Sequence, residues 1–294
     1  MIANLTAWGY FAAWRVLRWL PENFVYSSAN ALADRLVKRN GKSVQRLRSN
    51  LARTQNNITE LDLDLLVYRG MRSALRYWCD TFRFPDWSQE RIVETVTITN
   101  EALLLDAIAA GTGAIVTLPH CGNYDHAAAY FCLKGAKIVT VAEHLKPEKL
   151  FKKFMQFRAD FGMEALPLDG RVIPTLMQRI RSGAVIALAA DRDLSRSGID
   201  VTFFGGPARM PAGPALLAIR TGAPLLSAYI SYTEIGIHIH LEELEVPTQG
   251  TEVEKTAQLV QRSADRFAVG IAENPQDWHM MQRIWIDGDF KERH

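Results

Sequence analysis

Two patterns of apolar residues alternate between residues 93 and 233. Short apolar or β-branched runs are typical of strands buried on both faces of a sheet, and the segments between them repeat apolar residues every three or four positions, as amphipathic helices do. The predicted strands cover 93–100, 114–120, 137–143, 163–168, 184–190 and 224–233, and the predicted helices cover 101–111, 126–135, 147–162, 173–183 and 213–222. This alternation predicts an α/β fold in which a central, mostly parallel β-sheet is flanked by helices.

The two ends of the chain depart from this alternation. Before residue 83 the pattern predicts helices alone, over 4–20, 23–39, 42–54 and 60–82. After residue 233 it predicts an alternating strand at 235–244 and a long closing helix at 251–274. The sequence contains no internal repeat and no Gly/Ser-rich linker. We therefore expect a single domain over 1–294 that includes a helical amino-terminal region at 1–82.

Composition and charge exclude several classes of protein. Of the 294 residues, 48% are hydrophobic and 22% are charged, which is typical of a folded globular protein. The formal net charge of +2 is too even to favour a nucleic-acid partner. Residues 1–53, however, carry nine basic and two acidic side chains, a net charge of +7 that leaves −5 for the remainder. The charge is therefore distributed unevenly along the chain.

The first 20 residues combine this positive charge with three tryptophans, Trp8, Trp14 and Trp19. Arg15 and Arg18 are three positions apart and share a helix face. Such a helix suits the interface of an anionic membrane, where tryptophan lies at the headgroups and arginine reaches outward. A helix packed on the protein's own core is the alternative. We expect residues 1–20 to contact an anionic membrane surface.

Other sequence features bear on the cellular compartment. The three cysteines form no CxxC pair, which favours a reducing compartment. No apolar run reaches the ~18 residues of a membrane span, and the amino end lacks the order of charged and apolar segments found in secretory signals. We expect a peripheral protein at the cytoplasmic face of the plasma membrane.

A first polar cluster follows the predicted strand 114–120. His120 ends this strand, Asn123 is placed to cap the next helix, and Asp125 lies in that helix's first turn. A carboxylate that folds back onto an imidazole sets its tautomer and stabilises its cation, which suits a general base. The spacing therefore indicates a catalytic histidine, with a purely structural histidine as the alternative.

Two other chemistries are conceivable at this cluster. Cys121 could serve as a thiol nucleophile, although neighbouring residues at a strand end usually point apart. His126 could join His120 and Asp125 at a metal ion, but the sequence offers no further residues at metal-ligand spacing, and we expect no metal. His238 and His240 alternate on a strand, and we assign them a surface or edge role.

A second polar cluster follows the predicted strand 184–190. Asp191 ends this strand, and the loop and strand ends beyond it carry further charged side chains. The carboxyl ends of parallel strands meet at one edge of a sheet, so this loop should lie beside His120. The helix that opens at 211–214 adds a positive helix terminus, which favours anions. The further charged residues are Arg192, Asp193, Arg196, Asp200 and Arg209.

Together the two clusters resemble a known enzyme family. His-x4-Asp after a buried strand is the signature of the glycerolipid and lysophospholipid acyltransferases. The block ADRDLSRSGIDVTFFGGPARMPAGPALLA, followed by TGAPL, is similar to the branch that contains the lipid A late acyltransferases and the actinobacterial phosphatidylinositol mannoside acyltransferases. The lipid A enzymes usually show His-x4-Glu and an Asp-Gln-Asp loop, whereas this chain has Asp125 and Asp191-Arg192-Asp193. The phosphatidylinositol mannoside branch is the closer match, and the resemblance extends to WIDGDF at 285–290.

This resemblance implies transfer of a long-chain acyl group from acyl-CoA to a mannose hydroxyl of a membrane glycolipid, without a bound cofactor. It makes His120 the general base, Asp125 its motif partner, and an acid of the second loop a further partner. Asp191 is the first choice for that acid, with Asp193 and Asp200 also eligible. Groove-lining positions of the branch match Glu143 and Arg158, and Arg192, Asp193, Asp200 and Arg209 complete the expected substrate-binding set.

The physical mechanism is direct transfer. The imidazole takes the proton of the sugar hydroxyl as the oxygen attacks the thioester, and backbone N–H groups of the Gly-containing loops are expected to stabilise the oxyanion. No covalent acyl-enzyme is needed. Three alternatives remain open: a lipid A-type acyltransferase, a membrane-associated thioesterase or hydrolase, and a non-catalytic membrane-binding protein.

Overall fold

Seven strands form one sheet in the computed structural model, which describes residue 9 and residues 14–142, 148–168, 172–193, 195 and 197–288. The spatial order is β1-β9-β8-β2-β5-β3-β4, and every neighbouring pair except β8 and β9 is parallel. The strands are β1 (Val96–Thr99), β2 (Ala114–Leu118), β3 (Ile138–Ala142), β4 (Glu164–Pro167), β5 (Val185–Ala189), β8 (Leu225–Tyr232) and β9 (Ile237–Leu244). The predicted α/β fold with a mostly parallel central sheet is confirmed.

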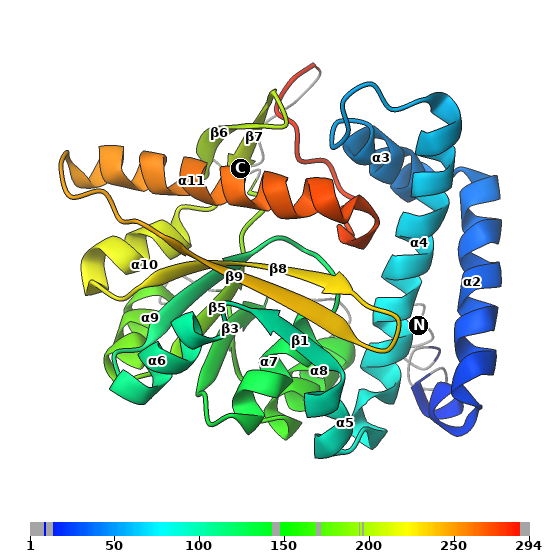
Figure 1. The fold of residues 1–294 in the computed structure, drawn as a ribbon, viewed down its shortest axis with the longest axis horizontal. Helices are drawn as coiled ribbons and strands as arrows, with labels where there is room; N and C mark the ends of the chain where they lie inside the picture. Colours follow the sequence, from blue (N-terminus) through cyan, green and yellow to red (C-terminus); the bar gives the residue numbers. More distant parts are fainter. Residues whose placement is uncertain are drawn as a thin grey trace.

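Helices cover both faces of this sheet (Figure 1). Helix α11 crosses one face, where its Gly270 lies against the ring of Tyr229, while α6 and α7 pack on the opposite face around Val116 and Leu118. The helices on or beside the sheet are α5 (Gln89–Glu94), α6 (Ala102–Ala110), α7 (Tyr124–Leu133), α8 (Glu148–Asp160), α9 (Val172–Arg181), α10 (Gly213–Thr221) and α11 (Glu252–Glu273). Because both faces are covered, β2 and most of β8 are buried, which explains their continuous apolar sequences.

The edge at which β2, β5 and β8 end, after Leu118, Ala189 and Tyr232, is called here the carboxyl edge. The amino-terminal helices α2 (Glu22–Arg39), α3 (Lys42–Leu51) and α4 (Glu60–Arg83) form a layer at this end of the sheet (Figure 1). Helix α4 reaches the edge directly, because Nη1 of Arg76 donates to the carbonyl oxygen of Thr233 at 2.9 Å. The helical layer therefore closes the side of the sheet where parallel α/β folds bind ligands.

Three elements, the two strands of a hairpin and one short helix, were not predicted from the pattern. The loop after Asp191 contains an antiparallel hairpin, β6 (Ile199–Phe203) and β7 (Gly206–Met210), whose tight turn places Phe204 and Gly205 at positive φ. The start of the predicted strand 93–100 is helical instead, because the hydroxyl of Ser88 caps α5 by accepting the N–H of Arg91. In both cases a local turn or a helix cap determines the structure, and the apolar pattern does not report either.

The segment before α2 is divided between core and surface. The Trp14 ring is buried, with centroid distances of 5.2 Å to Phe82, 5.7 Å to Phe154 and 5.6 Å to Phe157, whereas Trp19 is 80% exposed. Residues 1–8 and 10–13 of the predicted helix 4–20 lie outside the described residues. Within the described part of the chain, no helix is both long enough and apolar enough to cross a membrane.

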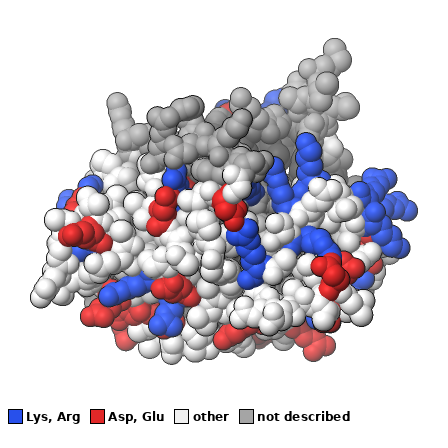
Figure 2. Space-filling view, turned by 90° about the horizontal axis from the view of Figure 1, so that it is seen from above, with Lys and Arg blue, Asp and Glu red and all other residues white. Residues whose placement is uncertain are grey.

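Basic side chains gather over the end of the molecule formed by the amino-terminal helices (Figure 2). Elsewhere on the face shown, acidic and basic residues are interspersed. The exposed basic residues of α2 and α3 are Arg35, Lys38, Arg39, Lys42 and Arg46. The uneven charge seen in the sequence is therefore also a local feature of the surface.

The carboxyl-terminal segment returns to the amino-terminal helices. The side-chain amide of Asn50 donates to the carbonyl oxygens of Met280 at 2.8 Å and Gln282 at 2.9 Å. Arg53 pairs with Asp287 at 2.7 Å, and its guanidinium lies 4.3 Å from the ring centre of Trp285. These contacts join residues more than 200 positions apart and hold the last described segment against α3.

Candidate active site

The loop after β2 is short and sterically constrained. Gly122 has φ of +50°, and a Cβ atom there would lie 2.5 Å from the carbonyl oxygen of Ile230, so only glycine fits. Asn123 then caps α7 by accepting the N–H of His126 at 3.0 Å, as predicted. A cap of this kind contributes about 1 kcal/mol to helix stability. The loop is thereby held in one conformation between His120 and Asp125.

His120 and Asp191 meet at the carboxyl edge. They follow the adjacent parallel strands β2 and β5, in which Leu118 is paired with Ala189. Nδ1 of His120 lies 2.6 Å from Oδ1 of Asp191, and the backbone N–H of His120 donates to Oδ2 at 3.1 Å. The Asp191 side chain is fully buried, whereas that of His120 is 45% exposed. The structure thus brings together the histidine and the acid that were the first choices from the sequence.

The charge of Asp191 determines the tautomer of His120. Burial raises the pKa of Asp191, but the positive charge of His120 and the hydrogen bonds from His120 and Trp278 outweigh it, and the pKa lies below its usual value. Asp191 is therefore ionised at neutral pH and acts only as an acceptor. The hydrogen on Nδ1 points at this carboxylate, which leaves Nε2 of the neutral ring unprotonated. An imidazole in this state can accept a proton at Nε2.

Residues 277–279, a segment that sequence reasoning missed, hydrogen-bond to both His120 and Asp191. The indole Nε1–H of Trp278 donates to Oδ2 of Asp191 at 2.9 Å, and the indole is fully buried. The backbone N–H of His279 donates to the carbonyl oxygen of His120 at 2.8 Å, and Gly122 N–H donates to the carbonyl oxygen of Asp277 at 2.9 Å. Nothing in the sequence spacing signals this arrangement, because the segment lies 150 residues away from the first loop.

The 277–279 segment is itself anchored to α4. The hydroxyl of Ser73 donates to Oδ1 of Asp277 at 2.6 Å and lies 2.9 Å from Nε2 of His279. Burial, followed by the charge of His120, lowers the pKa of His279 to about 3, so this ring is neutral at physiological pH. Because the Ser73 proton is directed at Asp277, Ser73 accepts from His279 and is not set up as a nucleophile.

The carboxylate of Asp125 has different partners. Nε of Arg158, from α8, donates to Oδ1 at 3.0 Å, and the hydroxyl of Tyr77, from α4, donates to Oδ2 at 2.8 Å. The charge of Asp125 raises the pKa of Arg158, so the guanidinium is a permanent cation. The sequence predicted that Asp125 would fold back onto His120; instead, its described hydrogen bonds join α7 to α4 and α8, and the carboxylate hydrogen-bonded to the imidazole ring is Asp191.

The remaining charged residues of the second loop stabilise the loop. Arg209 pairs with Asp200 across the β6–β7 hairpin and donates to the carbonyl oxygen of Ser195 at 3.2 Å. Asp193 accepts the N–H of Ser195 at 2.8 Å, and its own N–H donates to the carbonyl oxygen of Arg209. Arg192 follows Asp191 and is partly exposed. Glu143 lies outside the described residues.

One expectation about this loop's chemistry needs correction, and the structure also speaks against the thiol-nucleophile alternative that the sequence disfavoured. The N–H of Gly122 already donates to Asp277, so it is not available to stabilise an oxyanion. Cys121 is fully buried, its sulfur accepts the N–H of Ile230 at 3.3 Å, and burial raises its thiol pKa well above the usual value. A buried, protonated thiol is a poor nucleophile.

The other histidines of interest have structural partners. Nε2 of His126 lies 3.0 Å from the carbonyl oxygen of Ile92, and burial lowers the pKa of this ring to about 4. His238 contacts the hydroxyls of Thr97 and Thr99 on the edge strand β1, at 2.8 and 3.1 Å. Among the described residues, no group of three or more His, Cys, Asp or Glu is placed to hold a metal ion.

A small apolar cavity lies between the sheet and α7. Its volume is about 50 Å³, and its lining is almost entirely carbon. Leu118 and Tyr124, which flank the His120 loop in the chain, both line it, together with Phe131 of α7. An apolar group therefore finds a matching surface close to the polar His120–Asp191 pair.

Comparisons with known proteins agree with this geometry. The sequence model of the family described as bacterial lipid A biosynthesis acyltransferase matches residues 1–286. A Mycolicibacterium smegmatis protein named phosphatidylinositol mannoside acyltransferase is 39% identical over 286 residues, which is 96% of this chain and 92% of that protein. A Mycobacterium tuberculosis protein of the same name is 39% identical over 96% of this chain and 89% of its own length. The resemblance inferred from the two polar loops is confirmed.

Proposed function

Because this chain belongs to the bacterial lipid A biosynthesis acyltransferase family, we propose that it transfers a long-chain acyl group from acyl-CoA to a mannose hydroxyl of a phosphatidylinositol mannoside. The family establishes the chain as an acyltransferase; the donor, the acceptor and the residue roles are our proposal. The observation that carries it is the 2.6 Å contact between Nδ1 of His120 and the ionised, buried Asp191.

His120 acts as the general base in this proposal. Nε2 takes the proton of the sugar hydroxyl while that oxygen bonds to the thioester carbonyl carbon, and Asp191 stabilises the imidazolium that forms. The tetrahedral intermediate collapses, the carbon–sulfur bond breaks, and the imidazolium returns the proton to the departing thiolate. Atoms and charges balance without a covalent acyl-enzyme and without a cofactor.

The surroundings of His120 support both substrates. The apolar cavity beside Leu118 and Tyr124, with a volume of about 50 Å³, can take only a short part of the donor's alkyl chain. Arg192, next to Asp191 in the chain, is a cation placed to meet an anionic substrate group at this edge. Arg158 contributes through Asp125, and Asp193, Asp200 and Arg209 hold the loop that carries Arg192. We retain Glu143 as a substrate-binding residue on the resemblance alone.

The decisive test compares wild type and His120→Gln in a mass-spectrometric product assay with acyl-CoA and a panel of glycolipid acceptors. We expect the folded variant to lose about 10³-fold in kcat, because direct attack without the base is slow. His240→Gln, an exposed histidine on β9, is the matched control. Near-normal turnover by folded His120→Gln would overturn the mechanism. Preference for a lipid A-type acceptor, or acyl-CoA hydrolysis unaffected by any glycolipid, would identify the alternative enzymes.

We also propose that the protein binds the cytoplasmic face of the plasma membrane peripherally through residues 1–20 and the basic surface of α2 and α3. The exposed Trp19 and the neighbouring Arg15 support this, and each basic residue near an anionic surface adds about 1 kcal/mol. Vesicle co-sedimentation tests it with Trp19→Ala combined with Arg15→Glu, which leaves the buried Trp14 in place. Val253→Ala with Lys255→Glu on α11 is the control. Equal binding by both variants would refute the assignment.

A further inference from the structure

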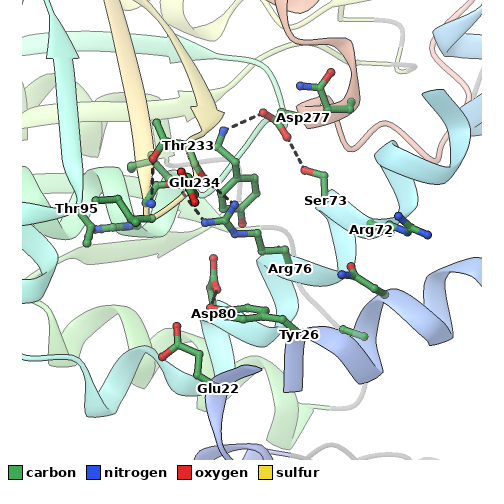
Figure 3. A pocket seen from close by; sticks show the side chains of 18 of the residues that line it. Glu22, Tyr26, Arg72, Ser73, Arg76, Asp80, Thr95, Thr233, Glu234 and Asp277 are labelled. Carbon is green, nitrogen blue, oxygen red and sulfur yellow. Dashed lines mark hydrogen bonds between the residues drawn. The ribbon is translucent and has the colours of Figure 1, made fainter. Parts of the chain in front are cut away.

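A cleft of about 780 Å³ opens between α2, α4 and the β8–β9 turn (Figure 3). It lies at the carboxyl edge, because Tyr232 ends β8, and Thr95 and Ile237 lie where β1 and β9 begin. β8 is the direct neighbour of β2, the strand that delivers His120. The cleft is therefore one strand away from the His120–Asp191 pair, along the same edge.

A thin wall separates the cleft from His120. Ser73 lines the cleft, and its hydroxyl lies 2.9 Å from Nε2 of His279. The backbone N–H of His279 in turn donates to the carbonyl oxygen of His120 at 2.8 Å. Only Ser73 and His279 therefore lie between a molecule in the cleft and the backbone of His120 along this chain of contacts.

Arginines are prominent in the lining. Arg69, Arg72 and Arg76 are spaced three and four apart and share the face of α4 that borders the cleft. Arg76 projects across its centre (Figure 3), where Nη1 and Nη2 donate to the carbonyl oxygens of Thr233 and Gly236, at 2.9 and 3.4 Å. Its guanidinium lies 4.1 Å from the ring centre of Tyr232. Five donors on one planar group leave Arg76 further N–H groups for a ligand.

Three of the four carboxyl groups that line the cleft are already occupied by protein donors, and the fourth, Glu234, is exposed. Glu22 forms a bidentate pair with Arg91, at 2.6 and 2.9 Å. Asp277 accepts from Ser73 and from the N–H of Tyr232, and Asp80 accepts from the hydroxyl of Tyr26 at 2.5 Å. These acids therefore oppose an incoming anion less than their number suggests, while the exposed Arg69 attracts it.

The rest of the lining is suited to hydroxyl groups. Side-chain amides and hydroxyls supply both donors and acceptors, which suits polyols. The indole Nε1 of Trp87 is buried and has no hydrogen-bond partner within the described part of the chain. A buried donor without a partner is costly unless a ligand or water satisfies it. The amide and hydroxyl residues of the lining are Asn23, Asn30, Ser73, Thr95, Thr233 and Gln276.

We propose that this cleft binds the headgroup of the acceptor glycolipid, with the phosphate diester against Arg69 and Arg76 and the hydroxyl-rich ring against the amides and hydroxyls. The proposal rests on the proposed function and adds the acceptor's binding site to it. Helix α2 supports an acceptor over a soluble donor, because it contributes Asn23 and Asn30 to the cleft and exposes Phe24 and Leu32 on its surface. A headgroup tethered to a membrane beside α2 would reach the cleft directly.

Steady-state kinetics test the proposal with acceptor presented in uncharged detergent micelles. We expect Arg69→Glu, and Asn30→Trp as a space-filling variant, to raise the acceptor KM about tenfold while kcat and the acyl-CoA KM stay within twofold. Arg181→Glu makes the same charge change at an exposed position of α9, outside the cleft, and should leave all three values unchanged. An unchanged acceptor KM in both cleft variants, or a rise confined to the acyl-CoA KM, would overturn the proposal.

A direct binding experiment separates this proposal from the proposed function. The soluble headgroup probe glycerophosphoinositol is titrated into the whole wild-type chain and into both cleft variants, with calorimetric detection and no turnover. We expect saturable binding that Arg69→Glu and Asn30→Trp weaken at least fivefold. Absent binding in wild type, or equal binding in all three proteins, defeats the cleft assignment. If wild type binds the probe but does not acylate a phosphatidylinositol mannoside, the cleft stands and the proposed function fails.

Discussion

The surroundings of Asp191 and Asp125 differ although both side chains are buried acids near His120. Asp191 is held by the imidazole, a backbone N–H and an indole N–H, and its most important partner can gain or lose a proton. Asp125 is held by Arg158 and Tyr77, whose protonation states do not change near neutral pH. The first environment suits chemistry at His120, and the second suits the joining of three helices. Burial alone therefore does not identify a catalytic carboxylate; the partner's ability to titrate does.

The strongest test of this comparison is Asp191→Asn. The amide keeps the size of the side chain but removes the charge that stabilises the imidazolium, so we expect kcat to fall about 10³-fold, or about 4 kcal/mol. Thermal unfolding of the variant verifies the fold, and Asp106→Asn, at an exposed position of α6, serves as the neutral control. Activity within tenfold of wild type would contradict the assigned role.

Asp125→Asn should act on stability first. It leaves the largely buried Arg158 without its counter-charge, and breaking a buried pair costs about 3 kcal/mol. Urea unfolding measures this loss, and the double variant with Arg158→Met should recover part of it, because both charges are then gone. If kcat per folded molecule falls as far as in Asp191→Asn while stability is unchanged, the two acids do not differ as we describe.

Trp278→Phe tests the third ligand of Asp191 with a smaller effect. The ring stays buried, but the indole N–H to Oδ2 is lost, and we expect kcat to fall about tenfold with KM unchanged. Trp285→Phe is the matched control, because its indole donates to Asn50 at 2.9 Å, away from the reacting groups. Both variants should lose about 1 kcal/mol of stability. Equal kcat values in the two would show that Trp278 has no role beyond packing.

His126→Gln should have the smallest effect, a change in how the free energy of unfolding depends on pH. The pKa of His126 is about 4 in the folded chain and about 6.5 when unfolded, so the unfolded state binds more protons below pH 6.5. Stability from this residue is therefore nearly complete above that value and declines as the pH falls, by about 0.7 kcal/mol between pH 7 and pH 6. Urea unfolding at both pH values should show a smaller decline in the variant. An identical decline would mean that other groups account for the pH dependence.

Much of the fold could be predicted from the sequence because the sheet is buried on both faces. A strand such as β2 must be apolar throughout, and helices packed on it must repeat apolar residues every three or four positions, so the pattern reports the architecture directly. The β6–β7 hairpin and α5 escaped prediction, since a positive-φ turn at Phe204 and a serine cap leave no periodic trace.

The site was predictable to the extent that it follows from strand ends. His120 and Asp191 each follow a parallel strand, so their meeting required only that β2 and β5 be neighbours. The partners of Asp125 were not predictable, because Tyr77 and Arg158 come from helices whose packing the sequence pattern does not specify. The contacts of Trp278 and His279 with Asp191 and His120 were not predictable for the same reason.

The return of the last described segment to His120 makes the order of synthesis matter. His120 and Asp191 are translated well before Trp278 and His279, the residues that donate to Asp191 and to the His120 carbonyl. Asn50 and Arg53 likewise find Met280 and Asp287 only after more than 200 further residues have been translated. A nascent chain can assemble the sheet and still lack support for His120, so the structure makes residues 277–287 the segment whose synthesis completes the site.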